Sequence, residues 1–169
     1  LSQKMANSGF YLFKPDKAYR MQQSPGRGKP NMKLVGENHP DGAIINYFVK
    51  NLKETDTVSL EILEMDGSLI QRFSNVAKEN KLDPDTDKPL DVELGGNRLI
   101  WNMRYPGYKT FKGMVFYSSP NIGPKAVPGD YKVRMNYEGQ TSEQILTIAK
   151  DPRLPNSDSD YRNQFNFLM

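Results

Sequence analysis

The amino-acid sequence predicts an all-β protein, an antiparallel β-sandwich of about seven short strands. Several segments alternate apolar and polar residues with a period of two, which is the pattern of half-buried strands. Clusters of turn-forming residues separate these segments, in a chain of 169 residues that holds 13 Gly and 12 Pro. No segment between the strands has convincing helical spacing. We expect an extended arm over residues 1–40, the sandwich over residues 41–150 and a tail over residues 151–169.

The N-terminal arm carries a basic excess, with seven Lys or Arg residues against only Asp16 and Glu37. Phe10–Phe13 is an aromatic cluster in this arm, too apolar to lie in water beside a soluble domain. We therefore expect it to add to, or cover, an edge of the sandwich, where unpaired strand groups need protection. The loop composition of residues 24–33 predicts a mobile segment.

Two strands and a tight hairpin are predicted in the first half of the sandwich. Residues 43–49 and 58–62 alternate in the way that buries every second side chain. Asp66 and Gly67 come after the second of these strands and are predicted to supply the two positive-φ residues of the hairpin. The chain then returns over residues 69–73.

The strand over residues 97–104 is bounded by Gly95-Gly96 before it and Pro106-Gly107 after it. Its apolar face carries Leu99, Trp101 and Met103, and its polar face carries Arg98, Asn102 and Arg104. The only tryptophan of the chain is therefore expected to be buried between the two sheets.

Further strands and one helix are expected in the second half. A short strand is expected over Met114–Tyr117. A second hairpin follows, because residues 131–137 alternate as a strand, turn at Glu138-Gly139 and return over residues 145–148. After Asp158, three apolar residues have the spacing of one helix face, which predicts a helix truncated by the chain end: Tyr161, Phe165 and Leu168.

The polar insert before Gly96 is interpreted as a long connection, too rich in Asp, Lys and Pro for a core strand. It holds three carboxylates with the alternate spacing of a Ca²⁺ loop: Asp83, Asp85 and Asp87. Lys88 stands where such a loop needs glycine, and Leu94 stands where it needs a bidentate Glu. We interpret the insert as an acidic, solvated loop that binds Ca²⁺ weakly or not at all.

Composition excludes several functional classes. Cysteine is absent, which removes disulfides, thiolate metal sites and cysteine nucleophiles. His39 is the only histidine and is interpreted as an exposed loop residue, so no histidine metal cluster can form. The net charge is only +3, and the basic residues are scattered through a Gly/Pro-rich arm, so we expect no nucleic-acid partner. No run of 18 apolar residues predicts a membrane-spanning helix.

Two carboxylate pairs have the residue types of a glycosidase acid and base, Glu61 with Glu64 and Asp91 with Glu93. They lie on a short strand and in a loop without a pocket signature. We therefore assign no catalytic residue, and no cofactor, to this chain.

Aromatic residues offer the remaining binding candidates. Trp101, Tyr131 and Tyr47 have the inward phase of their strands and are interpreted as core residues rather than sugar-stacking platforms. Other aromatic residues lie in or near loops, where a ligand or a neighbouring domain can dock beside a basic residue. These docking candidates are Arg104, Tyr105, Tyr108, Phe111, Phe116 and Tyr117.

Several stretches together resemble one family: DGAIINYFVKN from Asp41, VSLEILEMDGSLIQRF from Val58, NRLIWNMRYP from Asn97 and PGDYKVRMNYEG from Pro128. YLFKPDKAYR in the arm and KDPR at Lys150–Arg153 extend the likeness over nearly the whole chain. They resemble the immunoglobulin-like domain that follows a BNR/VPS10-type β-propeller in bacterial proteins often labelled glycosyl hydrolases.

This resemblance implies an exported accessory module, whether periplasmic, cell-surface or extracellular, that braces or extends a propeller of the same parent chain. The enzyme label would belong to the propeller, and the resemblance implies no catalytic residue here. A chain that begins at Leu1 is consistent with a fragment of a longer protein. The alternative interpretation is a carbohydrate-binding module that uses the loop aromatics.

Overall fold

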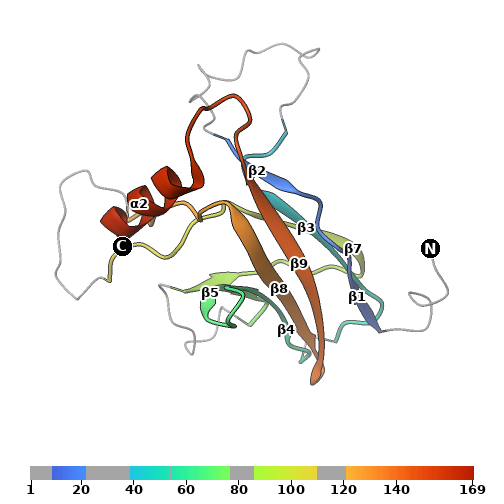
Figure 1. Ribbon diagram of the computed structural model, residues 1–169. Helices are drawn as coiled ribbons and strands as arrows, with labels where there is room; N and C mark the ends of the chain where they lie inside the picture. The colour runs from blue at the N-terminus through green and yellow to red at the C-terminus, as the bar shows by residue number, and fades with distance from the viewer. Residues whose placement is uncertain (1–8, 22–38, 54, 77–85, 110–120) are drawn as a thin grey trace, which may run out of the picture.

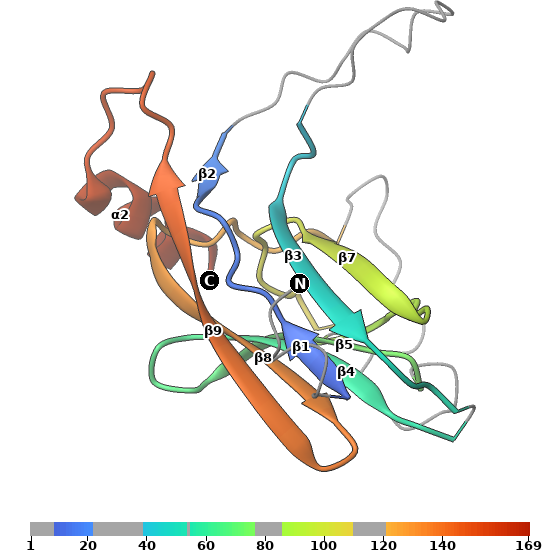
Figure 2. The ribbon, with the colours of Figure 1, turned by 90° about the vertical axis from the view of Figure 1, so that its right-hand side faces the viewer.

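The computed structural model describes residues 9–21, 39–53, 55–76, 86–109 and 121–169, which form two β-sheets and a C-terminal helix (Figures 1 and 2). One sheet has the order β1-β3-β7 and the other has the order β2-β9-β8-β4-β5-β6. The prediction of an all-β protein with two sheets is confirmed. The elements are β1 (Phe10–Leu12), β2 (Ala18–Arg20), β3 (Ala43–Val49), β4 (Val58–Leu63), β5 (Leu69–Ser74), β6 (Asp87–Pro89), β7 (Gly95–Trp101), β8 (Gly129–Tyr137), β9 (Gln140–Lys150) and α2 (Asp158–Leu168).

The core is filled by alternate residues of strands from both sheets. β3 buries every second side chain along its length, and β8 does so from Tyr131 onward, as their sequences predict. Trp101 at the end of β7 is fully buried, with its ring edge-on to that of Tyr131 at a centroid distance of 6.1 Å. Its Nε1 donates a hydrogen bond to the carbonyl of Arg104 at 3.3 Å. The predicted core positions of Trp101, Tyr131 and Tyr47 are confirmed.

Both predicted hairpins form, but one turn differs from its prediction. Glu138 and Gly139 have φ values of 47° and 74°, so the β8–β9 turn uses two positive-φ residues. In the β4–β5 turn only Gly67 has a positive φ, 94°, and the prediction of a second such residue at Asp66 is wrong. The Asp66 carboxylate instead accepts a hydrogen bond from the Ser68 amide at 2.8 Å, which stabilises the turn through a side chain.

Two strands come from within residues 1–40. β1 pairs antiparallel with β3 and forms one edge of the three-stranded sheet, which confirms the predicted role of Phe10–Phe13 (Figure 2). β2 then joins the other sheet, parallel to the last strand β9. The segment over residues 24–33 lies outside the described residues.

Part of the polar insert forms a strand, contrary to the interpretation as a connection alone. β6 pairs parallel with β5 at the edge of the six-stranded sheet. Pro89 is tolerated there because an edge strand leaves one side of its backbone unpaired. Asp87 in this strand is buried, which the solvated-loop interpretation did not foresee, and it lies 3.7 Å from Arg72.

Strand number and direction therefore differ from the prediction of about seven antiparallel strands. The described residues form nine strands, and two pairings are parallel, β2 with β9 and β5 with β6. In each of these pairs the edge strand, β2 or β6, has only three residues, which are too few to show a period of two. The strand expected over Met114–Tyr117 lies outside the described residues.

The outer face of the six-stranded sheet carries a row of alternating charges. Direct cross-strand partners on five neighbouring strands form it, in the order Glu143, Arg134, Glu61, Arg72 and Asp87. The separations of their charged atoms are 2.6, 3.4, 2.9 and 3.7 Å along the row. Opposite charges at paired positions stabilise the register of neighbouring strands.

The connection from β9 to α2 is a turn built on Asp151, which is 2% exposed. Its carboxylate accepts two hydrogen bonds from the guanidinium of Arg153, at 2.9 and 2.7 Å, and one from the Arg153 amide at 3.0 Å. Helix α2 then begins with a capping box in which Ser157 and Asp160 satisfy each other's amides. Figures 1 and 2 show α2 beside the start of β8. In the part of the chain that the structure describes, no helix is long and apolar enough to cross a membrane.

Acid should weaken this turn within a defined pH range. The hydrogen bonds from Arg153 lower the pKa of Asp151 from 3.8 to about 2. Because the folded pKa is depressed, the stabilising effect is complete above the unfolded pKa and is lost as the pH falls through about 2. A carboxyl titration followed by NMR should give a midpoint near 2 for Asp151. Arg153→Gln should raise that midpoint, and a midpoint at the ordinary value in the parent chain would contradict the assignment.

Candidate functional site

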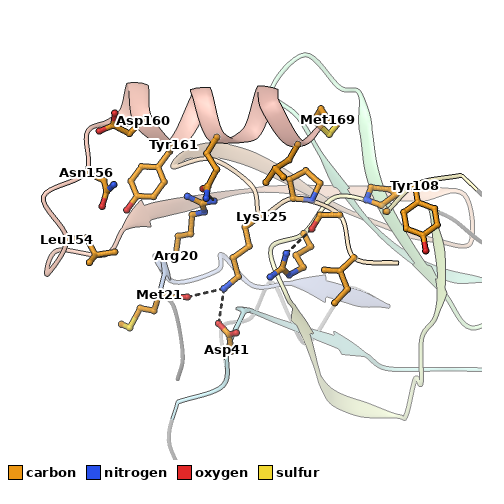
Figure 3. A pocket seen from close by; sticks show the side chains of 18 residues that line it. Arg20, Met21, Asp41, Tyr108, Lys125, Leu154, Asn156, Asp160, Tyr161 and Met169 are labelled. Atoms are coloured by element: carbon orange, nitrogen blue, oxygen red, sulfur yellow. Dashed lines mark hydrogen bonds and ion pairs between the residues drawn. The ribbon is translucent and has the colours of Figure 1, made fainter. Parts of the chain in front are cut away.

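A cavity of about 860 Å³ lies between helix α2, the end of β2 and two loop segments, one with Arg104 and residues 106–108 and the other with residues 122–125 (Figure 3). These elements are far apart in sequence, and the fold brings them together at one end of the sandwich. The volume is in the range of pockets that bind small molecules. This cavity is the candidate functional site.

The first wall of the cavity is a pair of extended segments after β7. Met103 adopts a φ of 56°, at the point where the chain leaves β7. The amide of Tyr105 donates a hydrogen bond to the carbonyl of Pro124 at 3.0 Å. The amide of Ala126 donates one to the carbonyl of Met103 at 2.7 Å. These backbone hydrogen bonds place the side chain of Arg104 at the cavity.

The second wall is helix α2, which packs through two aromatic residues. Tyr161 is 7% exposed, and the guanidinium of Arg20 lies over its ring at 4.6 Å from the centroid. Arg20 also donates from Nη2 to Oε1 of Gln164 at 2.9 Å. Phe165 lies edge-on to Tyr105, with centroids 4.7 Å apart. Helix α2 is thus attached to both β2 and the loop segment after β7.

The predicted apolar face of α2 is only partly buried. Tyr161 is buried and Phe165 is half-buried, in agreement with the prediction. Leu168 is 55% exposed and lines the cavity instead of entering the core.

The docking candidates from the sequence lie in different places. Arg104 and Tyr108 line the large cavity, and Tyr108 is 37% exposed. Tyr105 lies against Phe165, lines a smaller cavity of about 160 Å³ and donates its hydroxyl hydrogen to Glu64. Three further candidates lie outside the described residues: Phe111, Phe116 and Tyr117.

Arg20, Lys125 and Gln164 also line the cavity, although sequence reasoning did not select them. In the sequence, Arg20 was only one of the seven basic residues of the N-terminal arm. Its proximity to the helix depends on the β2–β9 pairing, which joins segments about 130 residues apart in sequence. Such a pairing leaves no local signal.

The carboxylate candidates have other contacts. Of the proposed metal ligands, Asp83 and Asp85 lie outside the described residues, and Asp87 lies next to Arg72 in the charge row. Within the described ranges, no three His, Cys, Asp or Glu residues are placed to hold a metal ion. Glu61 contacts two arginines, Arg72 and Arg134. Glu64 instead accepts a hydrogen bond from the hydroxyl of Tyr105. The pKa of Glu64 is raised, mainly by burial and also by the nearby charge of Asp66.

Gly123→Ala should disrupt the first wall of the cavity. A Cβ atom at this position would collide with the carbonyl oxygens of Tyr105 and Pro106, which are backbone atoms and cannot rotate away. We expect a loss of about 1–2 kcal/mol in unfolding free energy and faster hydrogen exchange at the Tyr105 amide.

Gly96→Ala is the matched control for Gly123→Ala, because a Cβ there would meet no atom within 4 Å. It should leave stability and exchange nearly unchanged. Equal effects of the two substitutions would contradict the close approach at Gly123.

Comparisons with known proteins give no relative: no family model, curated protein or solved structure matches this chain.

Proposed function

We propose that this chain is a non-catalytic, immunoglobulin-like accessory module of a larger exported bacterial protein, in which it braces or extends a β-propeller. Two structural features support the immunoglobulin-like type. The successive strands β1 and β2 join different sheets. The hydroxyl of Tyr131, near the start of β8, donates to the carbonyl of Val127 at 2.8 Å, as in the tyrosine corner of such domains.

The observation that carries the docking role is an exposed apolar surface at the end of α2. Phe167, Leu168 and Met169 are 89%, 55% and 73% exposed. Ile122, 56% exposed, lines the cavity together with Leu168 and Met169. Ile122, Leu168 and Met169 therefore form one exposed apolar surface, with Phe167 next to it in sequence, and a contiguous surface of this kind is typical of protein interaction sites. We assign this surface to the propeller that the sequence resemblance implies.

The test begins with the coding sequence upstream of Leu1, read for a longer parent chain. That upstream sequence should encode propeller repeats. In the longer chain, the amides of the α2 C-terminal turn should exchange more slowly than in the 169-residue chain. Absence of propeller repeats would overturn the proposal.

Phe167→Ser gives the matching variant test. Because Phe167 is almost fully exposed, the substitution should leave the stability of the 169-residue chain unchanged. In the longer chain it should weaken the contact between α2 and the propeller, so the amides of the α2 C-terminal turn should exchange faster. Leu94→Ser is the control, since Leu94 is 64% exposed and lies in the loop before β7. Equal effects of the two variants on the contact would count against this surface.

A second candidate function is carbohydrate binding, favoured by one specific observation. Tyr108 is partly exposed in the wall of a cavity that also presents the side chains of Asn156 and Gln164. An aromatic face together with amide groups suits a sugar ring, which has an apolar face and a hydroxyl-bearing edge. A glycan array on the 169-residue chain tests this candidate, and the absence of any bound glycan would exclude it.

A further inference from the structure

The cavity beside α2 contains two arginines that lack acidic partners. Arg20 and Arg104 both line it, and neither forms an ion pair within the described residues. Arg104 donates from Nη1 to the carbonyl of Gly123 at 2.8 Å, and Arg20 donates to the neutral Gln164. Their positive charges are therefore hydrogen-bonded but not neutralised.

The two side-chain carboxylates in the lining, those of Asp41 and Asp160, already have partners. Asp41 lies 3.3 Å from Nζ of Lys125, which also donates to the carbonyl of Met21 at 3.0 Å (Figure 3). Asp160 accepts hydrogen bonds from the amide and the hydroxyl of Ser157, at 2.8 and 2.7 Å, in the capping box of α2. Asp160 keeps its charge but is bonded to Ser157, so the two arginines remain without an ion-pair partner among the described residues, in a lining of three basic and two acidic side chains.

Arg20 is held in place before any ligand arrives. Its guanidinium is stacked on Tyr161 and bonded to Gln164. Burial lowers the pKa of Arg20, and the charge of Arg104 lowers it further, which indicates that the two cations are close enough to repel each other. Arg20 Nε and the Tyr161 hydroxyl are buried and have no hydrogen-bond partner among the described residues. An anion with several oxygens would supply acceptors to the guanidinium groups that line the cavity.

We propose that the cavity binds an acidic saccharide, with the carboxylate of a uronic acid placed between Arg20 and Arg104. The carboxylate accepts hydrogen bonds from the two guanidinium groups. The hydroxyls of the sugar that carries the carboxylate face the amide group of Gln164, beside Arg20, and a further sugar of the chain extends along the cavity toward Tyr108 (Figure 3). This inference rests on the second candidate function and narrows it from glycans in general to acidic ones.

Calorimetry on the 169-residue chain tests the proposal. The probes are a galacturonic acid trisaccharide and the neutral galactose trisaccharide. The acidic probe should bind and the neutral probe should not. Arg20→Gln and Arg104→Gln should each weaken binding of the acidic probe about tenfold or more. Binding should also weaken as salt is raised.

Two further variants separate loss of the site from loss of the fold. Asn156→Asp is nearly isosteric and adds a negative charge to the lining, so it should weaken binding of the acidic probe about fivefold without unfolding the chain. Arg98→Gln removes an exposed arginine of β7 that bonds to Asn46, outside the cavity, and should leave binding unchanged.

Three outcomes would overturn the proposal. Equal binding of both trisaccharides would exclude the carboxylate site while leaving carbohydrate binding intact. No binding of the acidic probe at millimolar concentration would exclude the acidic saccharide, whereas the propeller-docking function would stand on its own tests. Equal binding of a short polyglutamate peptide, with the same dependence on Arg20 and Arg104, would show an acidic peptide site instead of a sugar site.

Discussion

Trp101→Ala should cost about 3–5 kcal/mol of unfolding free energy, the largest loss we expect from any single substitution in this chain. The indole is fully buried in the core, so truncation leaves a cavity that the surrounding strands can fill only in part. The substitution also removes the edge-on contact with Tyr131 and leaves the Arg104 carbonyl without the indole donor. Denaturant unfolding measures the loss.

Ile100→Ala is the matched control, because Ile100 precedes Trp101 on the same strand and is 44% exposed on the opposite face. It should cost about 1 kcal/mol or less. The native chain should show the blue-shifted emission of a tryptophan shielded from water. A Trp101→Ala loss no larger than that of Ile100→Ala would contradict the core position.

The Trp101 position was predictable because the information is local. A period of two up to Trp101 assigns each side chain to a face. The expected bounds of the strand were wrong, because Gly95-Gly96 pairs with β3 inside β7, and β7 ends at Trp101, before the positive φ of Met103. The same period of two places Tyr47 and Tyr131 correctly. Alternation therefore predicts the sheets wherever a strand has one buried and one exposed face.

Short edge strands escaped prediction for a physical reason. β2 and β6 have three residues each, and their parallel pairing depends on strands formed elsewhere in the chain. Phe10–Phe13 was predictable in spite of this, because its four consecutive apolar residues needed a covering partner. The burial of Asp87 was not predictable, since an acidic residue in a polar insert gives no sign that Arg72 will lie beside it.

The candidate site was predictable only through its loop residues. Arg104 and Tyr108 were candidates because they lie in or near a loop, where burial in the core does not already explain a basic or aromatic residue. Arg20 and Tyr161 reach the same cavity through the β2–β9 pairing and the turn at Asp151, which are tertiary features. A sequence pattern can indicate that Tyr161 needs a partner surface, but it does not specify that an arginine from the arm will be there.

Glu61→Ala should cost about 2–3 kcal/mol, because it removes the central anion of the charge row. Glu61 is 8% exposed, and its two carboxylate oxygens lie 2.9 Å from Arg72 and 3.4 Å from Arg134. Removing one partner of a buried ion pair usually costs about 3–5 kcal/mol. We expect less because both arginine side chains are about one-third exposed, so water solvates the charges left behind.

Glu143→Ala provides the comparison that isolates burial from charge. Glu143 also contacts Arg134, at 2.6 Å, but its side chain is 43% exposed at the outer end of the row. Its removal should cost about 1 kcal/mol or less, and high salt should reduce that cost further. Denaturant unfolding of both variants at low and high salt decides the question. If the two substitutions cost the same, Glu61 contributes only as a surface charge, and the row does not fix the register of the sheet.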